Sequence, residues 1–292
     1  MNYPEGSTFG GDASHIRSLA VEELCSMYID KCNYDPSRHF DGLREIDLYE
    51  CEKTGMRFWR PSRVAGDEEF YASLSKLWHN YYKTDRWEYE GARKAIGIQQ
   101  AKVLEVGCGR GYFLKSIEAT AQSAAGLELN SKAIREKVTE FPVHPTTLQE
   151  HARTMAGKYD CVCSFQVLEH VADPMAFLTE SALLVRSGGK LIVSTPNYEF
   201  PIHASASDAF DLPPHHLNHF TPQVFERIAD TLGFKLISTS IQETLSPKYR
   251  VWVSKKHNKF QRFIRGSVNR LINPLASKVN PGHTILAVFE VP

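Results

Sequence analysis

An acid and three glycines in the first half of the chain have the types and spacing of a ligand-binding turn. A short apolar run, suited to a buried strand, reaches the acid and then breaks into glycines in the pattern Glu105-x-Gly107-x-Gly109-x-Gly111. Glycine lets the backbone approach a ligand closely because it has no Cβ. A dinucleotide fingerprint needs a third glycine where Tyr112 stands. The pattern therefore favours a nucleoside with a cationic amino-acid tail over a diphosphate.

A second acid and two later runs complete a set of motifs. Glu128 ends a strand-like run about twenty residues after the glycines, where an acid can accept both hydroxyls of a ribose. Four motifs then occur in order over roughly residues 85 to 240: E-V-G-C-G-R-G, G-L-E-L-N, Y-D-C-V-C-S-F-Q-V-L-E-H-V-A-D-P and G-G-K-L-I-V-S-T-P-N. With them the chain resembles the class I S-adenosylmethionine-dependent methyltransferases. It is similar to the branch that holds the ubiquinone-type O-methyltransferases and many sugar and natural-product methyltransferases.

The resemblance implies a cofactor and a fold. The cofactor is S-adenosyl-L-methionine, and the fold is a Rossmann-like α/β domain. Its seven-stranded, mostly parallel sheet has helices on both faces and an antiparallel last strand. By the same resemblance Glu105 and the three glycines cradle the methionine end of the cofactor, and Glu128 holds its ribose. The further cofactor contacts that we expect are Leu129, Leu148, Phe165 and Gln166.

Four histidines are candidates for acid–base chemistry. Methylation of a hydroxyl requires removal of its proton, and histidine is the side chain suited to this near neutral pH. His170 follows the fourth strand-like run, whereas His215, His216 and His219 lie in a long loop after the fifth. Position favours His216 and His219 as the general base, with His170 as a partner. We expect no metal here, because no carboxylate stands at helical spacing among these histidines.

The segments that must position these residues alternate between strand and helix. The expected elements are 102–107, 112–121, 124–129, 131–140, 143–147, 159–165, 174–186 and 190–195. Such alternation predicts a parallel sheet covered on both faces, with ligands at the carboxyl ends of its strands. Residues 197–222 form a loop long enough to be a functional lid, in which Asn197 and His215 are expected to contact the substrate. A helix opened by Thr221 precedes the last two strands.

The segment before the first core strand is rich in aromatic residues. Residues 68–96 read as one helix, and in resembling methyltransferases this segment folds over the cofactor and walls the substrate pocket. Tyr81, Tyr82 and Trp87 are the candidates for such contacts. The methyltransferase domain is therefore expected over residues 67–250, with its last strand at 284–292.

Residues 1–66 are expected to form an accessory region. Residues 1 to about 20 are polar and expected to be loose, a helix is expected from Ser18 to Lys31, and residues 46–61 read as a hairpin. Relatives of this branch carry a zinc ribbon at such a turn. Cys51 is present here, but Thr54 stands in place of the second thiolate. We therefore expect a ribbon-like hairpin without its metal, and a simple hairpin capping the sheet stays as an alternative.

A basic insertion precedes the last strand, at residues 251–283. Lysines and arginines between residues 255 and 272 occur with no acid among them, and apolar residues follow one helical face. Three interpretations stay open. The helix packs on its own domain with a solvated cationic face, it contacts an anionic substrate carrier or membrane surface, or it binds RNA.

Composition limits the partners and the compartment. Lysine plus arginine and aspartate plus glutamate number 34 each, so no global charge draws the chain to nucleic acid. The N-terminus has no secretory pattern, no apolar run approaches a membrane span, and the six cysteines read as reduced thiols. We expect a cytoplasmic protein, with the inner membrane face as a place of peripheral contact.

The leading functional hypothesis is O-methylation of a small-molecule hydroxyl, on a sugar, a glycan or a natural product, as in polysaccharide biosynthesis. A C- or N-methyltransferase of the same branch is the first alternative, since the motifs report the cofactor and not the acceptor. An inactive cofactor-binding scaffold is the second. Methylation of nucleobase amino groups is disfavoured, because Phe165-Gln-Val-Leu stands where those enzymes place an N/D-P-P-Y motif.

Overall fold

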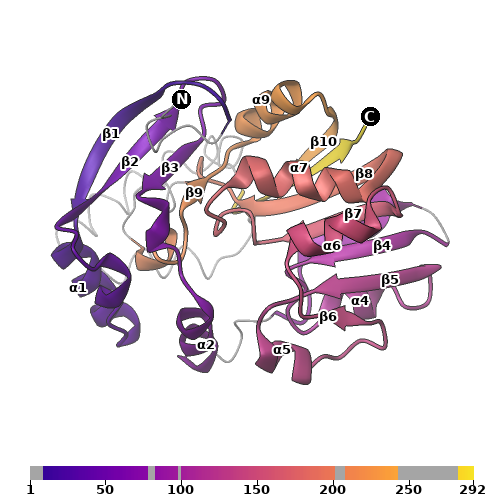
Figure 1. Ribbon diagram of the computed structural model, residues 1–292, viewed down its shortest axis with the longest axis horizontal. Helices are drawn as coiled ribbons and strands as arrows, with labels where there is room; N and C mark the ends of the chain where they lie inside the picture. Colours follow the sequence, from indigo (N-terminus) through magenta and orange to yellow (C-terminus); the bar gives the residue numbers. More distant parts are fainter. Residues whose placement is uncertain (1–8, 78–82, 98–99, 201–207, 243–281) are drawn as a thin grey trace, which may run out of the picture.

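The chain forms two β-sheets that lie side by side (Figure 1). The computed structural model describes residues 9–77, 83–97, 100–200, 208–242 and 282–292. A seven-stranded sheet forms the larger part of the molecule, and a four-stranded sheet built mainly from the N-terminal region lies beside it. The described helices include none that is long and apolar enough to cross a membrane.

The seven-stranded sheet is the expected Rossmann-like sheet. Its order is β10 (Lys235–Ile241), β11 (Thr284–Glu290), β8 (Val185–Pro196), β7 (Tyr159–Phe165), β4 (Lys102–Val106), β5 (Ser123–Leu127) and β6 (Val143–His144). The strands from β8 to β6 are parallel, and β11 is antiparallel to both of its neighbours. The expected fold class is therefore confirmed, including its antiparallel last strand.

Helices cover both faces of this sheet, which explains why its central strands β4, β7 and β8 contain continuous buried runs. Successive residues of β4 point to opposite faces: Val103 packs in a core with α3 (Trp87–Ile96) and α4 (Tyr112–Ser116). Leu104 packs in the other core, to which α6 (Leu148–Met155), α7 (Pro174–Leu184) and α9 (Pro222–Leu232) contribute. A further helix, α5 (Ser131–Arg135), follows β5.

Several helix boundaries follow from their capping residues. Thr221 accepts a hydrogen bond from the Val224 amide, and Gly233 ends α9 in the left-handed conformation, as expected. Helix α6 was not anticipated, although Thr147 and Glu150 form a complete capping box at its start. The expectation of one helix over residues 68–96 was wrong. The structure has α2 (Glu68–Leu77) and α3 instead, with Arg86 extended before α3.

The second sheet joins the N-terminal region to the lid. Its order is β1 (Ala13–Ala20), β2 (Glu45–Cys51), β3 (Arg57–Arg60) and β9 (Asn218–His219). β2 and β3 form the expected hairpin, with Leu48 opposite Trp59. β9 comes from the lid and pairs with β3, so the lid adds a strand to the N-terminal sheet. The expectation of a loose start was wrong for residues 13–20, which form β1, and α1 (Val21–Cys32) begins later than expected.

The hairpin turn packs its cysteine into the apolar core. Cys51 is buried in the apolar core with Met56. The hydroxyl of Thr54 accepts a hydrogen bond from the Met56 backbone amide at 3.3 Å. Within the part of the chain that the structure describes, no cysteine belongs to a group with metal-binding spacing. The basic insertion, by contrast, lies almost entirely outside the described residues.

Candidate active site

A cavity of about 1360 Å³ opens at the carboxyl ends of the parallel strands. Its walls come from the glycine turn after β4, from the ends of β5 and β7, from the segment before α3 and from the lid. Pockets for a drug-sized ligand are about 300–1,000 Å³, so this cavity has room for a cofactor and an acceptor together.

The glycine turn brings the backbone up to the cavity. Gly107 and Gly109 line it, and both have positive φ, of 71° and 53°. A Cβ at Gly107 would lie 2.5 Å from Val167, so a larger residue does not fit. Gly111 starts α4 at φ 77°, where a Cβ would meet Thr139 at 2.6 Å. Gly111 is not among the residues that line the cavity, so its role is to let the turn pack closely.

Glu105 ends β4 as a buried acid that faces the cavity. Its side chain is 3% exposed, and among the described residues its Oε2 atom has no hydrogen-bond partner. Burial raises the pKa of this carboxyl well above its usual range, the positive charge of Arg86 opposes the rise, and Glu128 adds to it. A buried carboxyl with an unpaired oxygen suits the ammonium group of an amino-acid ligand. The residues present therefore fit the methionine end of S-adenosylmethionine.

Glu128 also has a structural role that its position in the sequence did not predict. Its carboxylate accepts hydrogen bonds from the backbone amides of Gly109 at 2.7 Å, Leu129 at 2.9 Å and Asn130 at 2.7 Å. These bonds hold the glycine turn against the end of β5. A carboxylate offers about four acceptor positions, so Glu128 can also receive a ribose hydroxyl. The geometry fits the expected ribose contact and adds a structural role.

The other expected cofactor contacts also lie on the cavity. Leu129 and Leu148 line it on the side of β5 and α6, and Phe165 and Gln166 line it at the end of β7. Gln166 is one of the few non-glycine residues with positive φ, at 57°. Such conformations concentrate at functional sites. The Gln166 amide donates to Ser194 Oγ at 3.3 Å and to Glu88 Oε1 at 3.4 Å, which fixes its orientation.

Sequence reasoning expected an aromatic wall from this segment, but it chose other aromatic residues and missed two cationic ones. Arg86 and Lys83 line the cavity, together with Tyr71 and Tyr89. Arg86 lies 3.9 Å from Glu88 and its charge also acts on Glu105. The guanidinium suits the carboxylate of the cofactor's methionine, a group for which the sequence had suggested no partner. The sequence feature that could have indicated this wall is the pair of basic residues, Lys83 and Arg86, just before α3.

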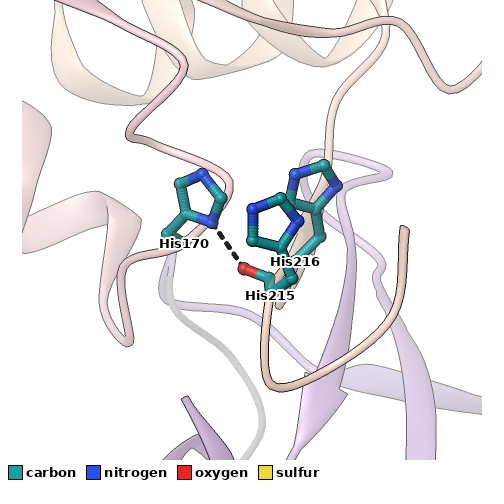
Figure 2. Close-up of side chains that lie close together, drawn as sticks. All are labelled: His170, His215 and His216. Carbon is teal, nitrogen blue, oxygen red and sulfur yellow. Dashed lines mark hydrogen bonds between the residues drawn. The ribbon is translucent and has the colours of Figure 1, made fainter. Parts of the chain in front are cut away.

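Three histidines meet at the lid end of the same cavity (Figure 2). His170 comes from the turn after β7, and His215 and His216 come from the lid. Their ring centroids are 4.7 Å (His170–His215), 4.9 Å (His170–His216) and 4.4 Å (His215–His216) apart. The Glu169 carbonyl accepts the amides of Leu217 and Asn218 at 2.8 and 3.0 Å, which ties the lid to the β7 turn. The structure thus brings together residues that are 45 positions apart.

The buried environment keeps the imidazoles of His170 and His215 neutral. Burial, reinforced by the neighbouring histidine, lowers the pKa of His170 and of His215 to about 3. A neutral imidazole offers one ring nitrogen as a proton acceptor or as a metal ligand. Both roles are therefore chemically open to these side chains at neutral pH.

Two acids accompany the histidines. Glu169 is fully buried, and among the described residues neither of its carboxyl oxygens has a hydrogen-bond partner. Burial raises its pKa to about 8. Asp211 Oδ1 lies 3.4 Å from His216 Nδ1. Both acids line the cavity, and neither was expected from the sequence.

The other expected site residues lie elsewhere. His219 is not part of the cavity wall. Its ring stacks on Tyr198 at 3.6 Å, and burial lowers its pKa to about 3. Asn197 is buried, and its side chain bonds the Gly282 carbonyl and the Glu199 amide, so it fixes the start of the lid. Trp87 is the first residue of α3 and packs against the apolar core. Tyr81 and Tyr82 lie outside the described residues.

Comparison with known proteins agrees with this cofactor site. A family model described as a methyltransferase domain matches residues 77–239, more than half of the chain. The chain therefore belongs to this methyltransferase family, and it is a class I S-adenosylmethionine-dependent methyltransferase. Its cofactor is S-adenosyl-L-methionine.

Curated relatives and solved structures are similar to parts of the chain. A ubiquinone biosynthesis O-methyltransferase of Vibrio parahaemolyticus is 34% identical over 172 residues, which cover 56% of this chain and 64% of the relative. One from Escherichia coli is 34% identical over 113 residues, covering 36% and 47%. The chain thus spans about half to just under two thirds of these relatives. A SAM-dependent methyltransferase from Archaeoglobus fulgidus shares the fold at a TM-score of 0.54 and 18% identity, over 76% of this chain and 99% of that chain.

Proposed function

We propose that this protein transfers a methyl group from S-adenosylmethionine to a hydroxyl group of a small molecule. One observation carries the proposal: the cavity that begins at the glycine turn ends at His170, His215 and His216. Methylation of a hydroxyl needs a cofactor site and a proton acceptor in one pocket, and this cavity supplies both. The O-methyltransferases among the relatives support the same choice of acceptor atom.

Different residues along the cavity bind the cofactor and exclude water. When bound, the cofactor would supply an electrophilic methyl group to the acceptor oxygen, with the neutral thioether as the leaving group. Positioning supplies much of the rate in such a reaction. The glycine turn, Glu105 and Glu128 hold the cofactor end, and Arg86 receives its carboxylate. Tyr71, Tyr89 and Phe165 provide aromatic surface that excludes water from the pocket.

His216 is the lid histidine that we propose as general base. Its imidazole lines the cavity, and the Asp211 carboxylate 3.4 Å from Nδ1 can stabilise the imidazolium that forms when the ring accepts a proton. His219 lacks this position because it stacks on Tyr198 away from the cavity wall. His170 stays a partner, since its Nδ1 donates to the His215 carbonyl at 2.5 Å.

The acceptor that we propose is a hydroxylated small molecule, with two groups of compounds to test. Sugars, glycans and natural products follow from the resemblance to that branch of methyltransferases. Hydroxylated acceptors of ubiquinone biosynthesis follow from the names of the curated relatives. We also propose that residues 255–272 contact an anionic carrier or the inner membrane face, on the strength of their basic sequence.

Two measurements test this function. Calorimetry with S-adenosylhomocysteine and NADH, side by side, should show binding of the first compound alone. Methyl transfer is then measured on both groups of acceptors, for the parent protein and for His216→Gln. The variant should retain S-adenosylhomocysteine affinity and lose about 10²–10⁴-fold in kcat. Equal turnover in both proteins would remove His216 as the base, and transfer only to carbon or nitrogen acceptors would overturn the hydroxyl assignment.

A further inference from the structure

We infer that His170, His215 and His216 form a binding site for a divalent transition-metal cation of the zinc type at the acceptor end of the cavity. One ring nitrogen from each histidine lies within 4.8 Å of the other two. Among the described residues, no other group of histidine, cysteine and acidic side chains has this geometry. Binding of the cation is independent of the proposed function, and only its effect on catalysis rests on that function.

The required adjustment is small. Three imidazole nitrogens at about 2.0–2.1 Å from a tetrahedral zinc ion lie about 3.4 Å apart. The widest pair would therefore close by at most about 1.4 Å, which rotation of side chains can achieve. The rings already lie beside one another on two different segments (Figure 2). A cation held between them would link the lid to the turn after β7.

The hydrogen bonds of the three rings orient them as metal ligands. The Nδ1 atom of His170 donates to the His215 carbonyl at 2.5 Å, and that of His215 donates to the Phe210 carbonyl at 2.9 Å. A carbonyl cannot donate, so both protons lie on Nδ1 and the lone pair of each neutral ring lies on Nε2. His216 Nδ1 hydrogen-bonds with the Tyr198 hydroxyl at 3.3 Å and lies 3.4 Å from Asp211 Oδ1. Histidines that bind metals have such carbonyl or carboxylate partners on the other ring nitrogen.

Glu169 is an independent indication of a cationic ligand. Its carboxyl is fully buried, lines the same cavity, and has no hydrogen-bond partner for either oxygen among the described residues. Its Oε1 atom lies 3.8 Å from His170 Nε2. A buried unpaired carboxyl is costly unless a cation or a donor satisfies it. Imidazole donors suit zinc, cobalt, nickel and copper ions, whereas magnesium and calcium prefer sites made of oxygen.

A cation at this position would change how the hydroxyl loses its proton. Three protein ligands leave an open coordination position, as in catalytic zinc sites. An acceptor hydroxyl bound there becomes more acidic, its proton leaves to water, and the oxygen keeps the electron pair with which it attacks. His216 then serves as a ligand and not as the base. The cation would thus promote the loss of the hydroxyl proton, which the proposed function assigns to the His216 imidazole.

Direct binding is the first test, on the full chain after removal of metals with a chelator. Zn²⁺ is titrated by calorimetry, and Co²⁺ by its visible absorption, which reports the donor geometry. We expect one equivalent per chain, and at least tenfold weaker binding in His170→Gln and in His216→Gln. His15→Gln, on the exposed part of β1, is the matched control and should bind as the parent does. No saturable binding, or equal affinity in all four proteins, would overturn the site.

Two readouts separate a failed site from a failed fold or function. Zn²⁺ should raise the Tm of the parent and of His15→Gln, but not of the cluster variants, because ligands stabilise only the folded form that binds them. S-adenosylhomocysteine binding is measured on the same samples. Retained cofactor binding without metal binding overturns this inference and leaves the proposed function standing. Metal binding with undiminished methyl transfer in the stripped protein overturns the catalytic role of the cation.

Discussion

The Nδ1 atom of His170 donates a hydrogen bond to the backbone carbonyl of His215 at a distance of 2.5 Å, across 45 positions of sequence (Figure 2). This bond joins the turn after β7, which lies at the cofactor, to the lid. The lid in turn pairs with the N-terminal hairpin through β9. The proposed acceptor and cofactor sites therefore meet at this pair of residues.

Removal of the Glu128 carboxylate should weaken cofactor binding. Glu128→Ala loses the proposed ribose contact and three hydrogen bonds to the glycine turn. Loss of hydrogen bonds to a charged group is worth about 1.5–3 kcal/mol, or roughly 10- to 150-fold in the Kd for S-adenosylhomocysteine by calorimetry. Glu226→Ala, on the exposed face of α9, is the control. An unchanged Kd would exclude the contact with the ribose.

A side chain at Gly107 should close the glycine turn to the cofactor. Gly107→Ala imposes positive φ on alanine and places its Cβ 2.5 Å from Val167. Gly157→Ala is a matched control, because Gly157 has φ 67° and open space around it. In both variants the backbone strain should lower the free energy of unfolding by about 1–2 kcal/mol, as measured by thermal unfolding. Only Gly107→Ala should also lose cofactor affinity, with partial recovery when Val167→Ala is added. Equal affinity in the two single variants would contradict the close approach.

Arg86 should contribute to cofactor binding. Arg86→Ala removes the proposed partner of the cofactor carboxylate and a charge that favours ionised Glu105. A charge-assisted hydrogen bond is worth about 1.5–3 kcal/mol, so the Kd for S-adenosylhomocysteine should rise about tenfold or more. Arg153→Ala, on exposed α6, controls for loss of a positive charge. A rise in the Kd of the control equal to that of Arg86→Ala would show only a general electrostatic effect.

The Asp160 carboxylate should make the free energy of unfolding depend on pH. The carboxylate accepts hydrogen bonds from the Lys102 backbone amide at 2.8 Å and from Arg186 Nε at 2.6 Å. These bonds lower the pKa of the carboxyl. The stabilisation is thus complete above the ordinary aspartate pKa of about 3.9 and is lost as pH falls through the lower folded value. Asp160→Asn should be less stable than the parent at neutral pH, and the difference should shrink below about pH 4.

Thermal unfolding across pH checks this expectation. Asp230→Asn, on the exposed face of α9, serves as the control and should follow the parent at every pH. A difference between Asp160→Asn and the parent that stays constant from neutral to acid pH would contradict the assignment to a carboxylate with a lowered pKa.

The cofactor half of the site was predictable, because local motifs encode it. Glu105, the glycines and Glu128 follow strands within one continuous stretch, so their spacing alone places them at one sheet edge. Gly111 is the exception, since only the packed structure shows that its Cβ would meet Thr139 and not the ligand.

The acceptor half was less predictable, because it depends on contacts between distant segments. No spacing shows that His170 approaches His215, that Glu169 is left unpaired, or that His219 turns to Tyr198. Likewise the pairing of β9 with β3 fixes the lid through residues more than 150 positions away. The expected absence of a metal rested on helical spacing, whereas the histidines converge from two loops.

The pairing of β3 with β9 ties the lid to the N-terminal sheet and leaves the glycine turn with the central sheet. The proposed methyl-donor site is formed by residues of the central sheet, whose positions depend on the α/β core. The proposed acceptor site includes the lid, whose strand belongs to the N-terminal sheet. Substitutions in the hairpin should therefore alter which acceptor is bound while the donor site stays intact. A change of substrate range would then begin in the first sixty residues and leave the glycine turn as it is.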